Sequence, residues 1–236
     1  MIPKKYSSAR AAGPSPGSVY RDIVAAIVDQ RLPPGTWLNE LAMCQLFKVS
    51  RRELERDLIR LAFEGLVSRL PNRGAFVASP DAQEARAIFA ARKAIEAGIV
   101  ELAAARASGA DFKALERCIA EEGAHRHAGR MREAIRASGQ FHLLLSGMAG
   151  NPILADQVRQ LIARTSLVTS LFENAGGMSC WHDDHAKLVG HLRARRTNRA
   201  IDLMRMHLDA LEESLDLEKM AGAKTDLRAI FGALGD

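Results

Sequence analysis

Proline is distributed very unevenly along this chain, and this distribution limits how its last two thirds can fold. Seven of the eight prolines lie within residues 1–80, and the remaining one is Pro152. Proline removes a backbone hydrogen-bond donor and disrupts the interior of a helix. Residues 81–236, in which helical spacing of apolar residues recurs, are therefore predicted to be helical throughout. A domain boundary is predicted near Ser79-Pro80.

The balance of positive and negative charge also changes near residue 80. Residues 1–80 hold 12 Lys/Arg and 7 Asp/Glu, whereas the rest of the chain holds 21 of each sign. The whole net charge of +5 thus lies in the first third of the chain. This is the distribution expected if only that third meets nucleic acid.

Membrane and secreted classes of protein are not indicated. No apolar run approaches the roughly 18–20 residues that a membrane-spanning helix needs, and no secretory leader is recognisable at the start of the sequence. Cys44, Cys118 and Cys180 are odd in number and far apart, which argues against a disulfide framework or a zinc ribbon. We therefore expect a cytoplasmic protein with no membrane contact.

The first third of the chain predicts three helices. Residues 1–17 are rich in Pro, Gly and Ser without periodicity, which predicts a flexible basic arm. Capping residues and apolar spacing then predict helices that begin near Ser18, Asn39 and Ser50. The tight turn between the second and third helices is typical of a helix-turn-helix.

A hairpin is predicted to follow the third helix. Leu66–Leu70 and Ala75–Ala78 are short strand-like runs on either side of Pro71-Asn72-Arg73-Gly74. This hairpin would carry Arg73 at its tip. Three helices and a basic hairpin together predict a winged helix-turn-helix over residues 18–80.

The third helix mixes acids with its arginines, although a helix that enters DNA is expected to avoid carboxylates. Ser50 and Glu53 match a capping box, so capping accounts for one of the acids. Further pairs at helical spacing, each worth about 0.2–0.5 kcal/mol, are Arg51–Glu55, Arg52–Glu55 and Glu53–Arg56. Because an arginine–guanine contact is worth about 1–3 kcal/mol, the arginines can leave such pairs for DNA. The alternative, a merely solvated helix, is disfavoured by the adjacent wing, and Asp57 receives no role.

Residues 18–80 resemble the GntR-type bacterial transcription regulators, and PPGTWLNE, VSR and NRGAFVA carry the resemblance. The resemblance implies that Arg51 contacts DNA. The family's second helix arginine is replaced here by Glu55, which can accept from a cytosine amine, and its third by Leu41. Lys48 replaces the usual turn glycine. The family's operator preference is therefore not carried over. The predicted DNA contacts are Arg51, Arg52, Glu55, Arg56, Arg73 and Gly74.

The rest of the chain predicts six helices, at about 82–108, 111–128, 131–149, 152–173, 180–196 and 199–219. Short connections between them favour an antiparallel all-α bundle, so the fold class is mainly α. FHLLLSGMAGNPIL and DDHAKLVGHLRARRTNRAIDLMRMHL resemble the FCD-type ligand-binding domain of the FadR-like subfamily. The resemblance implies that residues 81–236 form an effector-binding and dimerisation domain.

Three histidines on three of these helices can face the inside of the bundle. A single histidine on an apolar face is more often a hydrogen-bonded core residue than a metal ligand. The resemblance, however, implies a divalent metal held by Asp-x-x-x-His and two later histidines, which match His142, His185 and His207 here. Ser138 stands at the aspartate position. Three histidines with water still suit zinc, and we expect Zn or Ni.

Arg92 lies within the apolar stripe of its helix, where a charge needs a partner. One interpretation pairs it with Glu96, one turn further on. The other makes Arg92, together with Ser138, the holder of a small carboxylate effector, because loss of the aspartate leaves the metal site more positive.

The sequence predicts a ligand-responsive transcription repressor, not an enzyme. A homodimer is expected on a palindromic operator of double-stranded DNA, since two helix-turn-helix units read two half-sites. Two alternatives remain. One is a metal-dependent enzyme built on the three histidines, although no general acid or base accompanies them. The other is an architectural DNA binder with a degenerate sensor.

Overall fold

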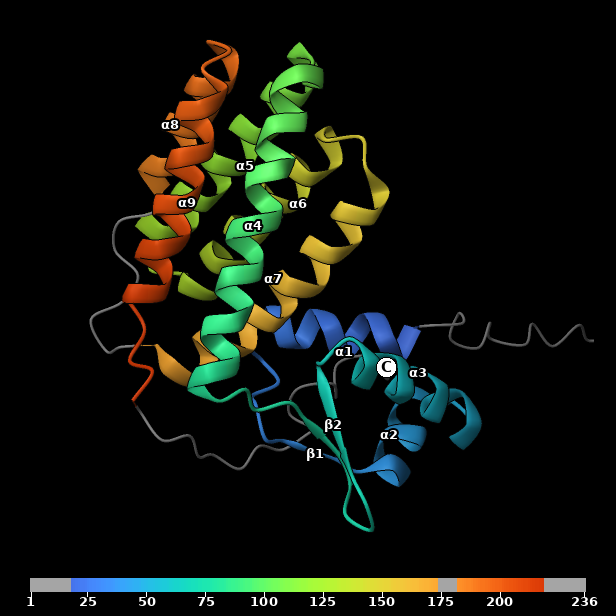
Figure 1. Cartoon of the computed structure of the whole chain (residues 1–236). Coiled ribbons are helices and arrows are strands. Elements are labelled where there is room, and N and C mark those ends of the chain that lie inside the picture. Colours follow the sequence, from blue (N-terminus) through green and yellow to red (C-terminus); the bar gives the residue numbers. More distant parts are fainter. Residues whose placement is uncertain (1–17, 174–181, 219–236) are drawn as a thin grey trace, which may run out of the picture.

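The chain folds into a small winged unit of helices and strands, followed by a bundle of helices (Figure 1). This computed structural model describes residues 18–173 and 182–218. The predicted arm of residues 1–17 and Cys180 lie outside the described residues. In the part of the chain that is described, no helix has the length and apolar character needed to cross a membrane.

Three helices and a three-stranded antiparallel sheet make up the winged unit. The helices are α1 (Ser18–Val28), α2 (Glu40–Phe47) and α3 (Arg51–Phe63), and the strands are β1 (Trp37–Leu38), β2 (Val67–Leu70) and β3 (Gly74–Val77). The sheet order is β1-β3-β2, and the β2–β3 hairpin extends away from the bundle (Figure 1). The predicted hairpin is thus confirmed. The sequence did not predict β1, since a strand of two residues shows no alternation.

Helix α3 begins with the predicted capping box. The Ser50 Oγ accepts from the Glu53 backbone N–H (3.3 Å), and the Glu53 carboxylate accepts from the Ser50 backbone N–H (2.9 Å). Lys48, between α2 and α3, has φ 54°, a left-handed conformation that glycine adopts at least cost. Leu54, Leu58 and Leu61 are buried and fix the inward face of α3.

Asp57, for which the sequence suggested no role, joins α3 to α1. Its side chain is buried and accepts a hydrogen bond from the backbone N–H of Tyr20, over 3.2 Å. Tyr20 lies in the first turn of α1, where backbone N–H groups have no partner within the helix. The carboxylate of Asp57 thus caps α1 from another helix.

Two of the pairs predicted within α3, Arg51–Glu55 and Arg52–Glu55, are not formed in the described structure. The third is supported, because the pKa of Glu53 is lowered by its hydrogen bonds with Ser50 and also by the charge of Arg56. In the described structure Arg51 pairs with Glu40 of α2 (3.4 Å), Arg56 pairs with its neighbour Asp57 (3.6 Å), and Glu55 pairs with Arg69 of β2 (3.4 Å). Exposed side chains of this length can reach partners on neighbouring elements. Surface ion pairs stabilise a protein only weakly, whether they form within one helix or between two elements.

Helices α4 to α9 form the bundle, as predicted. Their bounds are α4 Ala82–Arg106, α5 Gly109–His127, α6 Met131–Met148, α7 Pro152–Phe172, α8 His182–Arg193 and α9 Thr197–Glu213. The punctuation expected from the sequence is present: Ser108 and Asp111 form a capping box at α5, and Asn151 caps α7 with Pro152 at its start.

Helix α7 packs in both parts of the molecule. Its residues Ala163 and Leu167 belong to the hydrophobic core of the winged unit, whereas Val158 and Ile162 belong to the core of the bundle. Figure 1 shows α1 lying against the end of α7. Helix α7 therefore contributes side chains to both cores.

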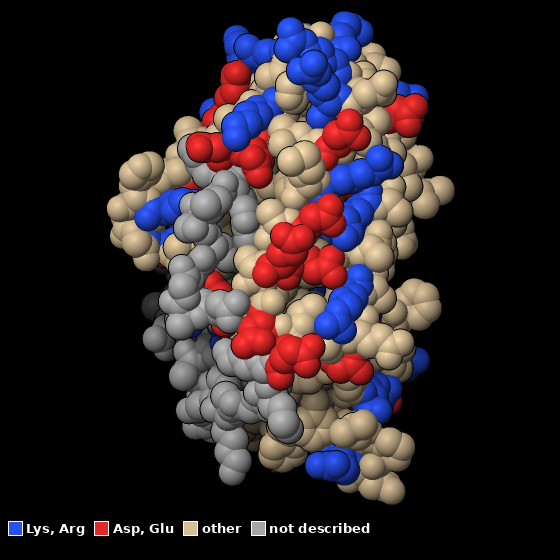
Figure 2. All heavy atoms as spheres, turned by 60° about the vertical axis from the view of Figure 1, so that its left-hand side comes forward, with Lys and Arg blue, Asp and Glu red and all other residues tan. Residues whose placement is uncertain are grey.

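The surface of the bundle carries both signs of charge. Figure 2 shows the side on which α8 and α9 lie in Figure 1, with acidic and basic side chains next to one another. Lys93 of α4 pairs there with Asp209 (2.6 Å) and Glu212 (3.0 Å) of α9. This mixture agrees with the balanced charge of residues 81–236 and leaves the charge excess to the N-terminal third.

Candidate functional site

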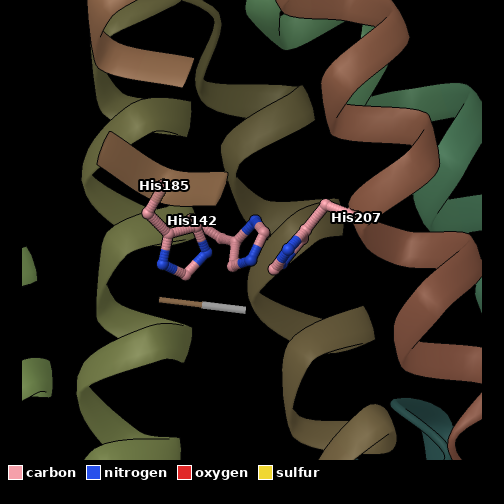
Figure 3. A group of neighbouring side chains, drawn as sticks. All are labelled: His142, His185 and His207. Carbon is pink, nitrogen blue, oxygen red and sulfur yellow. The ribbon is translucent and has the colours of Figure 1, made fainter. Parts of the chain in front are cut away.

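Three histidines meet inside the bundle. His142 comes from α6, His185 from α8 and His207 from α9, and each is at most 3% exposed. One ring nitrogen from each lies within 4.8 Å of those from the other two, and the rings turn toward one another (Figure 3). Each histidine occupies an apolar face of its helix, so burial of the three faces brings the imidazoles together.

A carboxylate stands behind each of these rings at Nδ1. The Nδ1 of His142 lies 2.5 Å from Glu96 Oε2, that of His185 lies 2.9 Å from Glu122 Oε2, and that of His207 lies 3.7 Å from Asp184 Oδ2. An ionised carboxylate only accepts hydrogen bonds, so the protons of His142 and His185 sit on Nδ1 and leave Nε2 with a lone pair. The buried Nε2 of His185 has no hydrogen-bond partner within the described structure.

Burial lowers the pKa of all three histidines and favours their neutral form. For Glu96, burial alone would raise the pKa, but the charge of Arg92 and the bond to His142 hold it well below its usual range. For Glu122, burial would likewise raise the pKa, but the hydrogen bonds and charges of His185 and Arg126 outweigh it, so the pKa lies below its usual value. Neutral imidazoles with ionised carboxylates behind them are the form in which histidine binds a metal.

Two arginines hold the two buried glutamates. Arg92 Nε donates to Glu96 Oε1 over 2.7 Å, and Arg126 donates to Glu122 Oε1 over 2.9 Å. The pairing of Arg92 with Glu96, which the sequence left as one of two interpretations, is therefore formed. Arg92 also lies 3.4 Å from the hydroxyl of Thr165 on α7.

Both arginines line a small cavity beside the histidines. Its volume is about 40 Å³, and its polar lining consists of Arg92, Arg126, Ser138, His142, Thr165, Ser166 and Thr169. Ser138, the residue at the family's aspartate position, thus faces the same space as Arg92. The structure places the two residues predicted to bind an effector together, next to one of the three histidines.

Sequence reasoning missed Glu122, Arg126 and Asp184. A signal for Glu122 was present, because it continues the apolar stripe of Leu115, Cys118 and Ile119 on α5 at helical spacing. An acid within such a stripe requires a buried partner, as Arg92 did. No comparable signal marks Asp184, which is only partly buried and lies in the first turn of α8.

The residues predicted to contact DNA lie at the surface of the winged unit. Arg51, Arg52, Glu55 and Arg56 are exposed on the first half of α3, and Arg73 and Gly74 are exposed at the hairpin. Gly74 has φ 89°, and a Cβ added there would lie 3.3 Å from the indole nitrogen of Trp37. Leu41, at the position of a family arginine, is 71% exposed on α2.

Comparison with known proteins adds two family matches. Residues 17–77 match the model of the bacterial regulatory proteins of the gntR family, and residues 87–210 match the FCD domain. The HTH-type transcriptional repressor GlaR of Escherichia coli (strain K12) is 32% identical over 206 residues, which cover 80% of this chain and 90% of GlaR. The Nta operon transcriptional regulator of Aminobacter aminovorans is 26% identical over 202 residues, covering 85% of this chain and 93% of that regulator.

Solved structures share the fold. The chain matches McbR/YncC of E. coli with a TM-score of 0.74 at 18% identity, covering 83% of this chain and 95% of that one. A putative GntR regulator of Rhodococcus sp. RHA1 matches with a TM-score of 0.73 at 21% identity, covering 83% and 94%. At these identities the match shows a common fold.

Proposed function

We propose that this chain, which belongs to the gntR family of bacterial regulatory proteins with an FCD domain, is a repressor released from DNA by a small carboxylate. Family membership makes it a DNA-binding transcription regulator, and the relatives named above are regulators rather than enzymes. The observation that carries the finer proposal is the adjacency of an arginine-lined cavity and a buried histidine cluster.

DNA binding is assigned to the exposed half of α3 and to the wing. Arg51, Arg52 and Arg56 are positioned for bases or phosphates, with Arg73 and the Gly74 backbone at the hairpin, while Glu55 is available to a cytosine amine. The capping box assigns Glu53 to the N-terminus of α3, next to these arginines. Two protomers reading two half-sites would account for a palindromic operator.

The histidine cluster fits a divalent metal. It offers three neutral imidazoles, a set that Zn²⁺ accepts with a fourth position left open, and the orphaned Nε2 of His185 is one of the atoms that would bind. Ni²⁺ is also suited to imidazole. When bound, the ion would supply a Lewis acid at which an anionic ligand completes the coordination. His142, His185 and His207 would hold it.

The cavity supports a small carboxylate as the effector. Arg92 pairs with Glu96 through its Nε, and its Nη1 lies within hydrogen-bond distance of the Thr165 hydroxyl at the cavity. Ser138 supplies a hydroxyl there in place of the family's aspartate, so an anion would meet a hydroxyl rather than a carboxylate at that position. Ligand pockets usually measure about 300–1,000 Å³, whereas this cavity measures about 40 Å³. The present space admits only the head of an organic acid, so a larger acid requires the surrounding helices to move.

A displacement of α7 would directly affect the packing of the winged unit. Thr165, Ser166 and Thr169 on one face of α7 line the cavity, and Ala163 and Leu167 lie in the core around α1. A ligand that binds one arrangement of α7 better than another shifts the population of the two. In a homodimer such a shift would change the spacing of the two winged units.

Thermal melting with a set of small organic acids tests the proposal. The metal-loaded chain is expected to be stabilised by one class of acid, because a ligand that binds only the folded state raises the melting temperature. The same acid should release the chain from operator DNA. An architectural DNA binder with a degenerate sensor would show neither effect.

A further inference from the structure

Each of the two buried glutamates of the site contacts one arginine and one histidine. In each case one carboxylate oxygen accepts from an arginine and the other accepts from a histidine Nδ1. The first set is Arg92, Glu96 and His142, with distances of 2.7 Å and 2.5 Å. The second set is Arg126, Glu122 and His185, with both distances at 2.9 Å. Four different helices, α4, α5, α6 and α8, contribute to this repeated arrangement.

Burial makes these contacts obligatory. Glu96 is 1% exposed and Glu122 is fully buried. A buried carboxylate is strongly unfavourable unless its oxygens are hydrogen-bonded and its charge is paired. Each glutamate meets both needs by using one oxygen for the arginine and one for the histidine. A carboxylate that turns away from its imidazole therefore loses one of these two bonds.

We propose that Glu96 and Glu122 are positioning residues of the histidine site, and that Arg92 and Arg126 act on that site by holding these glutamates. Each glutamate fixes the ring orientation of its histidine, keeps the proton on Nδ1, and so presents Nε2 to a metal. The proposal rests on the metal site proposed above.

The same geometry connects the metal site to the cavity. Arg92 and Arg126 both line the cavity, so an anion bound there contacts the partners of both glutamates. By competing for these arginines, such an anion would change the hydrogen bonds that Glu96 and Glu122 make with His142 and His185. Because coupling between two binding sites is reciprocal, metal binding would alter anion affinity by the same factor.

The third histidine provides an internal comparison. His207 Nδ1 lies 3.7 Å from Asp184 Oδ2, a longer distance than in the other two histidine–carboxylate pairs, and Asp184 also lies 3.5 Å from Lys187. The Asp184 side chain is 23% exposed. Water can therefore replace its contribution, and neutralising Asp184 should disturb a bound metal less than neutralising either glutamate.

The test is titration of the metal-free full chain with Ni²⁺ by calorimetry. We compare the unmodified chain with Glu96→Gln, Glu122→Gln, Asp184→Asn and Glu64→Gln. Glu64 is a buried glutamate of the winged unit, bonded to Tyr20 and Arg60, and serves as the matched control. Ni²⁺ affinity should fall about 10–100-fold in each of the two site glutamate variants. It should fall less in Asp184→Asn, and it should be unchanged in Glu64→Gln.

Melting of each metal-free variant separates positioning from folding. A glutamate that is only structural would lower the melting temperature and leave Ni²⁺ affinity unchanged, and that result in both variants would overturn the positioning role. If Glu96→Gln does not fold, Glu122→Gln decides the question alone. Absence of stoichiometric Ni²⁺ binding by the unmodified chain would overturn the metal site itself, and this proposal with it.

Discussion

Gln30 donates a hydrogen bond from its side-chain Nε2 to the hydroxyl of Thr169, over 3.1 Å. Gln30 follows α1 in the winged unit and has a left-handed backbone with φ 52°. Thr169 is buried on α7 and lines the cavity beside Arg92. This hydrogen bond thus connects the wall of the proposed effector site with the DNA-binding part of the molecule.

Replacing Gln30 with Ala should weaken the response to effector more than it weakens DNA binding itself. The substitution removes the bond to Thr169 but leaves the DNA-facing residues of α3 intact. The ratio of operator affinities with and without a releasing acid, measured by fluorescence anisotropy, should move toward one. Gln157→Ala, at an exposed position of α7, is the matched control. An unchanged ratio in Gln30→Ala would show that the signal takes another route.

Replacing Arg51 with Ala should reduce specific operator binding. Loss of a base contact made by arginine costs about 1–3 kcal/mol, which is about 5- to 150-fold in affinity. Arg132→Ala removes one positive charge from an exposed position of α6 and should have little effect. Equal affinity and equal sequence preference in Arg51→Ala and the unmodified chain would refute the role given to Arg51.

Replacing Asp57 with Ala should destabilise the winged unit by about 1–3 kcal/mol, because a partly buried backbone N–H of α1 loses its acceptor. Urea unfolding measures the change in the free energy of unfolding. Glu55→Ala, on the exposed face of the same helix, should stay within about 0.5 kcal/mol of the unmodified chain. Equal stability of the two variants would mean that water replaces Asp57 at Tyr20.

The metal-free chain should lose stability as the pH falls from 7 toward 5. Burial lowers the pKa of His142, His185 and His207 in the folded state, whereas an unfolded histidine has a pKa of about 6.5. Below that value the unfolded chain takes up more protons than the folded chain, so stability decreases with falling pH. Melting temperatures at pH 7.5 and pH 5.5 check this. A His185→Asn variant should show a smaller difference, and equal melting temperatures in the unmodified chain would contradict the assignment.

The sequence predicted those parts of the fold that depend on local rules. The capping box of Ser50 and Glu53, the hairpin around Arg73 and the six bundle helices follow from residue spacing and turn chemistry, and all are present. The predicted partners of Glu55 were wrong, because Glu55 reaches Arg69, which lies 14 residues further along the chain. Such pairs depend on the packing of neighbouring elements.

The candidate site was predictable only in part. Apolar stripes placed His142, His185 and His207 on inward faces, and the family resemblance connected them. The carboxylates behind them come from other helices, with Glu96 46 residues from His142 and Glu122 63 residues from His185. Helical spacing within one element says nothing about which partner another helix supplies.

Operator release by an organic acid, compared between the unmodified chain and His185→Ala, tests the central claim most directly. Both proteins are loaded with Ni²⁺ and titrated with an acid that stabilises the unmodified chain, and anisotropy of a labelled operator duplex is recorded. The unmodified chain should leave the DNA as acid is added, while His185→Ala should stay bound at the same acid concentration. Equal release by both proteins, or release by neither, would contradict a carboxylate sensor built on the histidine cluster.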